Sequence, residues 1–214
     1  MSNRADGGRP ASKVDAHRLA ELATELLLLR PPGVGRTRLG VVDGPSGSGK
    51  STFARRWTSM LQERALPDER CPPSVLLFSS DLLATWADPF GWFERFDAGV
   101  LGPLAGGRDG RVRLTDWSSG EPRPGAWMVI PVVDVLILEG VSCGRRALGD
   151  RVGVSVWLKV SGRGDRLERA VARDGELSRA QLAAWQDAED EFFERDQPGN
   201  RADFLAAPGQ PPHW

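Results

Sequence analysis

The stretch that decides the fold runs from Leu39 to Ser51 and reads LGVVDGPSGSGKS. Its first part, Leu39–Val42, is an apolar run that predicts a strand, and Ser51–Arg64 predicts the helix that follows. The loop between them, Gly44–Ser51, satisfies the pattern GxxxxGK(S/T) in the strand-loop-helix context that this motif requires. A glycine-rich loop of this kind wraps its backbone N–H groups around a phosphate, and the next helix directs its positive dipole end at it. The stretch therefore predicts a nucleotide-binding loop.

The loop also assigns roles to individual side chains. Lys50 would neutralise the outer phosphates of ATP, and the Ser51 hydroxyl would ligate Mg²⁺. The residues expected to bind the ATP phosphates are Gly44, Ser46, Gly47, Ser48, Gly49, Lys50, Ser51 and Thr52. The alternative is an ordinary glycine and serine turn between a strand and a helix. We disfavour it because the motif stands where the mechanism needs it.

Other apolar and periodic segments predict the rest of the architecture. Three further apolar runs predict strands: Val75–Phe78, Val132–Leu138 and Val152–Val160. Helical spacing of apolar residues is found at Val14–Arg30, Asp165–Arg173 and Ser178–Arg195. Continuous apolar strands that alternate with helices indicate a parallel sheet covered on both faces. We therefore expect an α/β protein with the three layers of a P-loop NTPase fold.

Two carboxylates follow predicted strands on the side of the sheet where the phosphate loop lies. Open α/β sheets bind ligands outside the carboxyl ends of their strands, so Asp81 and Glu139 should converge with the loop on one crevice. Glu139 is the candidate for the Mg²⁺ side, and Asp81 is placed to orient an acceptor hydroxyl and take its proton. The alternatives are a plain strand-terminal carboxylate for Glu139 and a helix N-cap for Asp81. Asp134, at the other end of its strand, is interpreted as structural.

Three arginines recur at helical spacing in the segment RGDRLERAVARD. Arg166, Arg169 and Arg173 stand at i, i+3 and i+7, which places them on one face of a helix. Such a row can clamp a transferring phosphoryl group while its charge spreads over the equatorial oxygens. It can equally form ion pairs with neighbouring carboxylates on the solvent side. The sequence leaves both interpretations open.

The composition excludes several classes of function. Lys and Arg number 28 against 29 Asp and Glu, so the chain lacks the overall charge of a dedicated nucleic-acid binder. Cys71 and Cys143 have no CxxC partner, and His17 and His213 lie near the two ends, which argues against zinc sites and Cys/His catalysis. The apolar runs stay far below the roughly 20 residues of a membrane span. We therefore expect a cytoplasmic protein that binds neither membranes nor nucleic acids.

The chain is expected to form one main domain with flanking segments. Residues 1–36 are predicted to hold a flexible N-terminus and one helix, 37–207 the P-loop domain, and 208–214 a tail. Within the domain, 88–131 is an insertion on the acceptor side that we expect to cover one edge of the sheet, and 161–180 is lid-like. The aromatic cluster at the start of the insertion, Phe90, Trp92, Phe93 and Phe96, is interpreted as packing rather than as a base-stacking surface.

Taken together, these motifs resemble the uridine/cytidine kinase branch of P-loop small-molecule kinases, and in particular short uridine kinase-like ATP-binding proteins of high-GC bacteria. The likeness runs from about Leu39 to Phe204. It rests on Gly44–Ser51, Ser80-Asp81, Leu101–Arg108 (LGPLAGGR), Asp116-Trp117, Leu136–Gly140 (LILEG), Arg166–Asp174 and Arg201–Asp203. The resemblance implies a five-stranded parallel core with Mg-ATP as phosphate donor. It also implies Asp81 as the base, Arg169 and Arg173 in a closing lid, and Asp116 and Trp117 in the acceptor site.

The acceptor half departs from that family. The family's motif after the second strand ends in tyrosine, whereas Asp81 is followed here by Leu82, Leu83 and Ala84. The family's pyrimidine-reading histidine is also missing, because Ser118, Ser119 and Gly120 follow Trp117. The resemblance favours a kinase for a nucleoside hydroxyl, and these departures make a pantothenate-like or sugar-like alcohol the alternative acceptor. A regulatory ATPase without a small-molecule acceptor is the third hypothesis.

Overall fold

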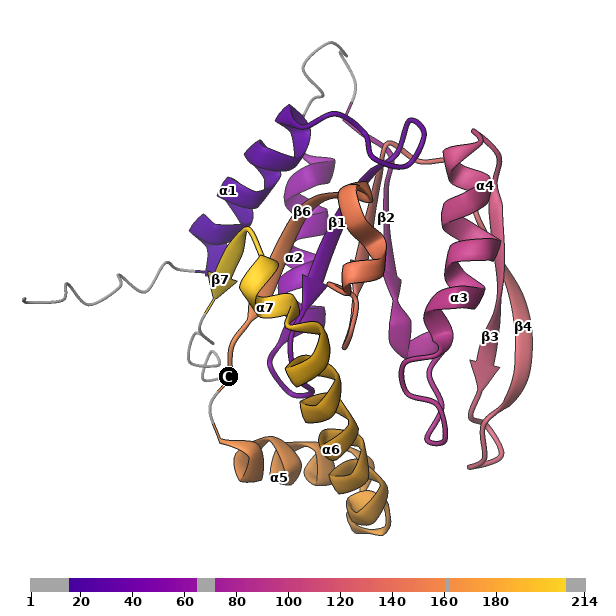
Figure 1. The fold of residues 1–214 in the computed structure, drawn as a ribbon, viewed down its shortest axis with the longest axis vertical. Coiled ribbons are helices and arrows are strands. Elements are labelled where there is room, and N and C mark those ends of the chain that lie inside the picture. The colour runs from indigo at the N-terminus through magenta and orange to yellow at the C-terminus, as the bar shows by residue number, and fades with distance from the viewer. Residues whose placement is uncertain (1–15, 65–71, 161, 207–214) are drawn as a thin grey trace, which may run out of the picture.

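The computed structural model describes residues 16–64, 72–160 and 162–206. Its centre is a sheet of five parallel strands in the order β2-β5-β1-β6-β7 (Figure 1). The strands are β1 (Arg38–Asp43), β2 (Val75–Ser79), β5 (Val135–Glu139), β6 (Val152–Leu158) and β7 (Phe204–Ala206). This arrangement confirms the predicted parallel sheet and its five strands. The three-residue strand β7 at the edge is the one that no apolar run predicted.

One face of the sheet is covered by α1 (Ala16–Leu29) and α2 (Lys50–Gln62). Side chains of β1, β5 and β6 that point to this face, such as Val42, Ile137 and Val156, pack with Leu27 and Trp57 in one hydrophobic cluster. The Trp57 indole is fully buried there. The two helices match the periodic segments predicted before and after the phosphate loop, and together they form the first helical layer.

The opposite face is covered by the segment predicted as an insertion. It contains α3 (Trp92–Phe96), the π-helical turn η2 (Asp97–Leu101), α4 (Gly102–Ala105) and the antiparallel hairpin of β3 (Gly110–Asp116) and β4 (Arg123–Ile130). Trp92, Phe96 and Leu101 are fully buried and share a cluster with Val41 and Leu136 of the sheet. The expectation that this segment covers an edge is therefore wrong. Its helices form the second helical layer, because the face needs apolar cover, and the hairpin lies outside them (Figure 1).

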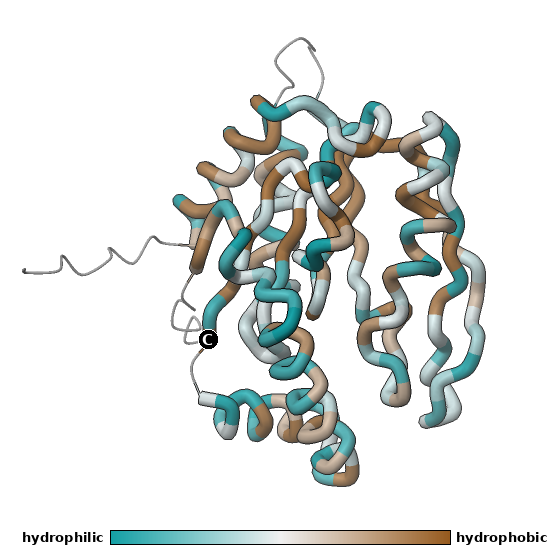
Figure 2. Tube along the Cα trace, in the orientation of Figure 1, coloured by the Kyte–Doolittle hydropathy of each residue, from teal (hydrophilic) through white to brown (hydrophobic). Residues whose placement is uncertain are grey.

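The predicted aromatic cluster has mainly a packing role. Trp92, Phe93 and Phe96 are buried between the sheet and the hairpin, which confirms the interpretation for these three residues. Phe90 instead contacts Trp185 and Phe192, with ring centroids 6.2 and 5.0 Å away. Figure 2 shows the same organisation, with hydrophobic segments along the central strands and between the layers.

The C-terminal helices extend past the carboxyl ends of the strands (Figure 1). They are α5 (Arg163–Asp174), the short turn η4 (Glu176–Ser178), α6 (Arg179–Asp196) and α7 (Pro198–Arg201). Two other 3-10 turns, η1 (Ser80–Leu82) and η3 (Arg146–Arg151), follow β2 and precede β6. None of the helices in the described ranges has the length and apolar content needed to cross a membrane.

The predicted flexible N-terminus and tail fall mostly on residues 1–15 and 207–214, which lie outside the described residues. The expected domain boundaries stay predictions. The one helix of the first segment, α1, packs directly on α2 and the sheet rather than apart from them.

Candidate functional site

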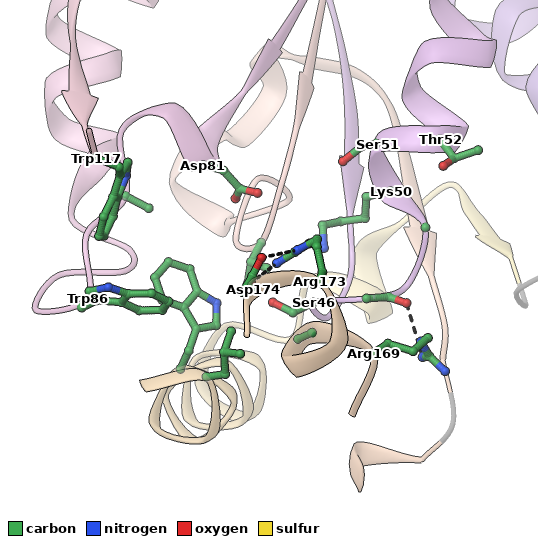
Figure 3. A pocket seen from close by; sticks show the side chains of 17 residues that line it. Ser46, Lys50, Ser51, Thr52, Asp81, Trp86, Trp117, Arg169, Arg173 and Asp174 are labelled. Atoms are coloured by element: carbon green, nitrogen blue, oxygen red, sulfur yellow. Dashed lines mark hydrogen bonds and ion pairs between the residues drawn. The ribbon is translucent and has the colours of Figure 1, made fainter. Parts of the chain in front are cut away.

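A cavity of about 590 Å³ lies at the carboxyl ends of the strands. Its wall is assembled from the phosphate loop, the start of α2, the segment after β2, the tip of the β3–β4 hairpin, and helices α5 and α6 (Figure 3). Ser46, Gly47, Gly49, Lys50, Ser51 and Thr52 line one end, and Asp81, Trp86, Trp117 and Trp185 line the other. Arg169, Arg173 and Asp174 of α5 lie along it. One cavity thus joins most of the predicted phosphate-binding residues to Asp81.

The phosphate loop has the backbone conformation that its glycines allow. Gly47 and Gly49 have φ values of 73° and 87°, in the left-handed region that L-residues with a side chain disfavour. Gly44, at φ 143°, has a different constraint, since a Cβ there would lie 2.5 Å from the Leu158 carbonyl oxygen of β6. Helix α2 begins at Lys50, so its first N–H groups lie at the loop. Of the predicted phosphate-binding residues, Gly44 and Ser48 are not among those that line the cavity.

The ammonium group of Lys50 lies back over the loop. It donates a hydrogen bond of 2.9 Å to the Pro45 carbonyl, and the residue is buried. Lys50 nevertheless lines the cavity, beside Ser51. The hydrogen bond therefore holds the Lys50 ammonium group against the loop, at the wall of the cavity, where its positive charge can meet an incoming phosphate.

The predicted magnesium ligands are adjacent. Parallel pairing aligns Val42 with Glu139, which brings the end of β5 next to the phosphate loop. The Ser51 hydroxyl donates to Glu139 Oε1 at 3.2 Å, while Oε2 is buried and has no hydrogen-bond partner. Burial and the nearby charge of Asp81 raise the pKa of Glu139, while the neighbouring Ser79 and Ser51 hydroxyls and the charge of Lys50 lower it. A hydroxyl and a carboxylate with one vacant oxygen are suitable donors for Mg²⁺, so these two residues fit the ion.

Asp81 stands in the turn η1 at the end of β2 and reaches into the cavity opposite Lys50 and Ser51 (Figure 3). None of the described residues donates a hydrogen bond to its carboxylate. The N-cap alternative does not hold, because η1 has Ser79 at its N-cap position and no side-chain cap. Asp81 is thus an unpaired carboxylate that faces the phosphate loop across the cavity, as a base for an acceptor hydroxyl would.

The arginine row of α5 divides between two environments. Arg169 and Arg173 line the cavity, whereas Arg166 is buried behind the loop and pairs with Glu189 at 3.1 Å. Arg169 donates to the Gly47 carbonyl at 3.4 Å, and Arg173 makes two hydrogen bonds of 2.7 and 2.6 Å to Asp174. Of the two interpretations left open, the phosphate clamp does not hold for Arg166, because the helix crosses the loop and its first turn meets protein rather than the cavity. The pairing of Arg173 with Asp174 is of the kind that the second interpretation predicted.

The end of the cavity that Asp81 lines, where the acceptor is predicted to bind, is built mainly from indoles. Trp86 lies edge-to-face with Trp117 and with Trp185, at centroid distances of 5.5 and 5.6 Å. Trp117 was predicted here, while Trp86 and Trp185 were not, since lone tryptophans in a loop and on a helix carry no local signal of a shared site. Asp116 is exposed, accepts an N–H from Ser118 at 2.9 Å and is not among the lining residues. Its predicted role in acceptor binding stays a prediction.

A further carboxylate that the sequence analysis missed holds the phosphate loop from below. Asp43, the last residue of β1, accepts backbone N–H groups from Gly44 at 2.6 Å, Ser142 at 3.0 Å and Gly144 at 2.7 Å. Burial raises the pKa of Asp43 to about 6, although these hydrogen bonds and Lys50 lower it. Asp43 therefore clamps the start of the loop to the segment that follows Glu139.

No protein-family model matches this chain, and no curated protein aligns with it significantly. Solved structures do resemble it. A possible uridine kinase from Bacillus stearothermophilus is 18% identical over 87% of this chain and 96% of its own, with a TM-score of 0.58. A candidate fructose transport system kinase from Silicibacter sp. TM1040 is 20% identical over 90% and 98%, with a TM-score of 0.50. A candidate P-loop kinase with a circular permutation, from Saccharomyces cerevisiae, is 12% identical over 91% and 98%, with a TM-score of 0.51. At these identities the likeness establishes the fold, which is that of P-loop kinases.

Proposed function

We propose that this protein is an ATP-dependent phosphotransferase that moves the γ-phosphate of Mg-ATP to a hydroxyl group of a nucleoside. The observation that carries the proposal is one cavity in which the phosphate loop and the unpaired carboxylate of Asp81 face each other. Phosphoryl transfer needs a phosphate cradle, a metal side and a group that orients the attacking hydroxyl. The proposal is supported by the phosphate loop and Asp81, which line this cavity, and by Ser51, which also lines it and donates a hydrogen bond to Glu139, the second residue proposed to hold the metal.

Each residue then has a defined task in the reaction. Lys50 and the loop N–H groups other than that of Ser46, which donates to Glu189, bind the phosphates. Mg²⁺, held on the side of Ser51 and Glu139, would supply charge neutralisation when bound. Asp81 accepts the proton of the acceptor hydroxyl, whose oxygen forms a bond to the γ-phosphorus. The bond from that phosphorus to the β,γ-bridging oxygen breaks, and ADP leaves with its electron pair. Arg169 and Arg173 offer positive charge to the phosphoryl oxygens during the transfer.

The indole walls support an acceptor with a flat ring. Trp86, Trp117 and Trp185 present large apolar surfaces beside Asp81, and such surfaces stack on nucleobases. Indole N–H groups donate and do not accept, so they would read carbonyl or ring-nitrogen acceptors on the ring. The alternative acceptor is a sugar-like or pantothenate-like alcohol. It is favoured by the missing family tyrosine and histidine and by the fold shared with a candidate fructose transport system kinase.

The decisive experiment measures ADP release from Mg-ATP with and without a panel of nucleosides, sugars and pantothenate-like alcohols. A nucleoside is expected to accelerate release in the wild type and to have no effect in Lys50→Ala. If only a sugar accelerates ADP release, the sugar and not a nucleoside is the acceptor. ADP release that no acceptor changes would favour the regulatory ATPase instead.

The role of Asp81 is tested with Asp81→Asn against the control Asp150→Asn, an exposed aspartate in η3 at the opposite end of the sheet. Loss of a general base lowers kcat by about 10²- to 10⁴-fold, while the affinity for Mg-ATP stays within about twofold. The control should match the wild type in both. Equal losses of turnover and ATP affinity in Asp81→Asn would contradict the role of general base and assign Asp81 a metal-binding or structural role.

A further inference from the structure

A second buried carboxylate touches the phosphate loop from the side away from the cavity. Glu189 of α6 has no exposed surface and is not among the residues that line the cavity. Its Oε1 and Oε2 atoms lie 3.2 and 3.1 Å from the backbone nitrogen of Ser46, and the Ser46 hydroxyl also donates to Oε1. A side chain 143 positions away along the chain therefore fixes the orientation of a loop peptide.

The same carboxylate anchors the helix that carries the cavity arginines. Arg166 of α5, with a side chain only 7% exposed, donates to Glu189 Oε2 at 3.1 Å. Helix α5 also lies against the loop itself, since a Cβ on Gly47 would meet Arg166 at 3.8 Å and Arg169 donates to the Gly47 carbonyl. Glu189 thus joins three segments at one point: the phosphate loop, α5 and α6.

We propose that Glu189 is a positioning residue for phosphoryl transfer. It fixes the position of the phosphate loop relative to helix α5, which carries Arg169 and Arg173. The inference rests on the proposed function and adds a residue to the same site. The carboxylate charge strengthens the hydrogen bonds from Ser46 and also neutralises Arg166. With Arg166 paired away from the cavity, the positive charge offered to the nucleotide comes from the lining residues Lys50, Arg169 and Arg173, of which Arg173 also pairs with Asp174.

The packing of α5 against α6 does not by itself require a buried charge at Glu189. Arg163 of α5 already forms ion pairs with Asp187 and Asp190 of α6, and both pairs are solvent-exposed. Burying a carboxylate and a guanidinium has a high desolvation cost, and apolar residues of similar volume serve cohesion as well or better. The contact that apolar residues could not replace is the one to Ser46. The buried pair is therefore best explained by its effect on the loop.

The exposed pair supplies a matched control. Asp187→Asn weakens an α5–α6 ion pair without touching the loop, whereas Glu189→Gln removes the charge that meets both Ser46 and Arg166. After correction for the folded fraction, Glu189→Gln should lower kcat/KM for Mg-ATP about tenfold or more, and Asp187→Asn should stay within about twofold. Ser46→Ala combined with Glu189→Gln should lose less than the product of the two single losses, because both remove one shared interaction.

Two additions keep the test decisive. If Glu189→Gln does not fold, Arg166→Met/Glu189→Gln replaces the buried ion pair with a neutral pair and should fold while it retains the loss of kcat/KM. Amide hydrogen exchange of residues 44–50, measured without nucleotide, should be faster in the Glu189 variants than in Asp187→Asn. Equal kcat/KM and equal exchange in the Glu189 and Asp187 variants would overturn the positioning role. If the wild type turns over no more than Lys50→Ala, the proposed function fails, and the exchange rates alone then decide the role of Glu189.

Discussion

Replacement of Asp43 by asparagine probes the clamp beneath the phosphate loop. The wild-type carboxylate accepts three backbone N–H groups, two on Oδ1 and one, from Gly144, on Oδ2. The side-chain oxygen of asparagine can take the place of Oδ1. Its amide nitrogen would then face the Gly144 N–H, and because both groups are donors, no hydrogen bond forms there. An unsatisfied buried N–H costs about 1–3 kcal/mol, so Asp43→Asn should destabilise the fold at every pH.

A second, pH-dependent effect comes from the pKa of Asp43, which burial raises from 3.8 to about 6 in the folded protein. Because the folded state holds the proton more tightly, the group stabilises the fold below pH 3.8, and this stabilisation is lost as the pH rises through about 6. The full effect is about 3 kcal/mol at 1.36 kcal/mol per pH unit. Between about pH 4.5 and pH 7.5 it amounts to about 2 kcal/mol.

Urea unfolding followed by tryptophan fluorescence measures this difference, and both pH values avoid the isoelectric point near 6.2. The destabilisation caused by Asp43→Asn should be larger at the lower pH by about 2 kcal/mol, because only the wild type gains from protonation. Carboxyl groups whose pKa values are lowered, such as Asp134 and Asp203, are present in both proteins and cancel in the comparison. A destabilisation that is the same at both pH values would refute the buried, protonatable clamp.

Three other substitutions test the site and the core. Glu139→Gln should raise the Mg²⁺ concentration needed for half-maximal ADP release about tenfold or more, with little change in unfolding midpoint, and an unchanged Mg²⁺ requirement would contradict the metal role. Arg173→Ala should lower kcat about tenfold or more while the affinity for Mg-ADP, measured by calorimetry, changes little, because the charge acts on the transferring group. Gly40→Ala would place a Cβ 2.6 Å from the Ile137 side chain and should destabilise the protein by about 1–3 kcal/mol in urea unfolding. Gly164→Ala is the control for Gly40→Ala, because a Cβ there meets nothing within 4 Å and the variant should be at least as stable as the wild type.

The parts of the fold that the sequence predicted correctly are those built from contiguous segments. The phosphate loop, its strand and its helix are neighbours along the chain, so one stretch, Leu39–Arg64, contains the whole unit. Asp81 and Glu139 could be placed near it because parallel strands end at the same edge, and this geometry follows once the strands are identified. The aliphatic runs of β2, β5 and β6 are buried or half-buried strands, as their composition predicted.

Predictions failed where the outcome depended on which surface a residue meets. The segment at 88–131 covers a face of the sheet because the apolar side chains of that face needed a partner, and no local pattern distinguishes a face from an edge. Arg166, Arg169 and Arg173 share one face of a helix, yet they meet different surroundings because α5 crosses the phosphate loop. Trp86 and Trp185, about 100 positions apart, become neighbours only when α6 comes beside the segment that follows η1.

The sequence by itself thus predicted a phosphate-binding loop and determined its shape, because the strand, the glycines and the helix that form it are neighbours along the chain. Tertiary structure alone decided what surrounds that loop. Asp43 and Glu189 hold it through hydrogen bonds to residues about 100 and 143 positions away, and such contacts exist only after the chain has closed long loops between them. The shape of the indole-lined end of the cavity was decided in the same way, because Trp86, Trp117 and Trp185 come from three separate segments that packing brings together.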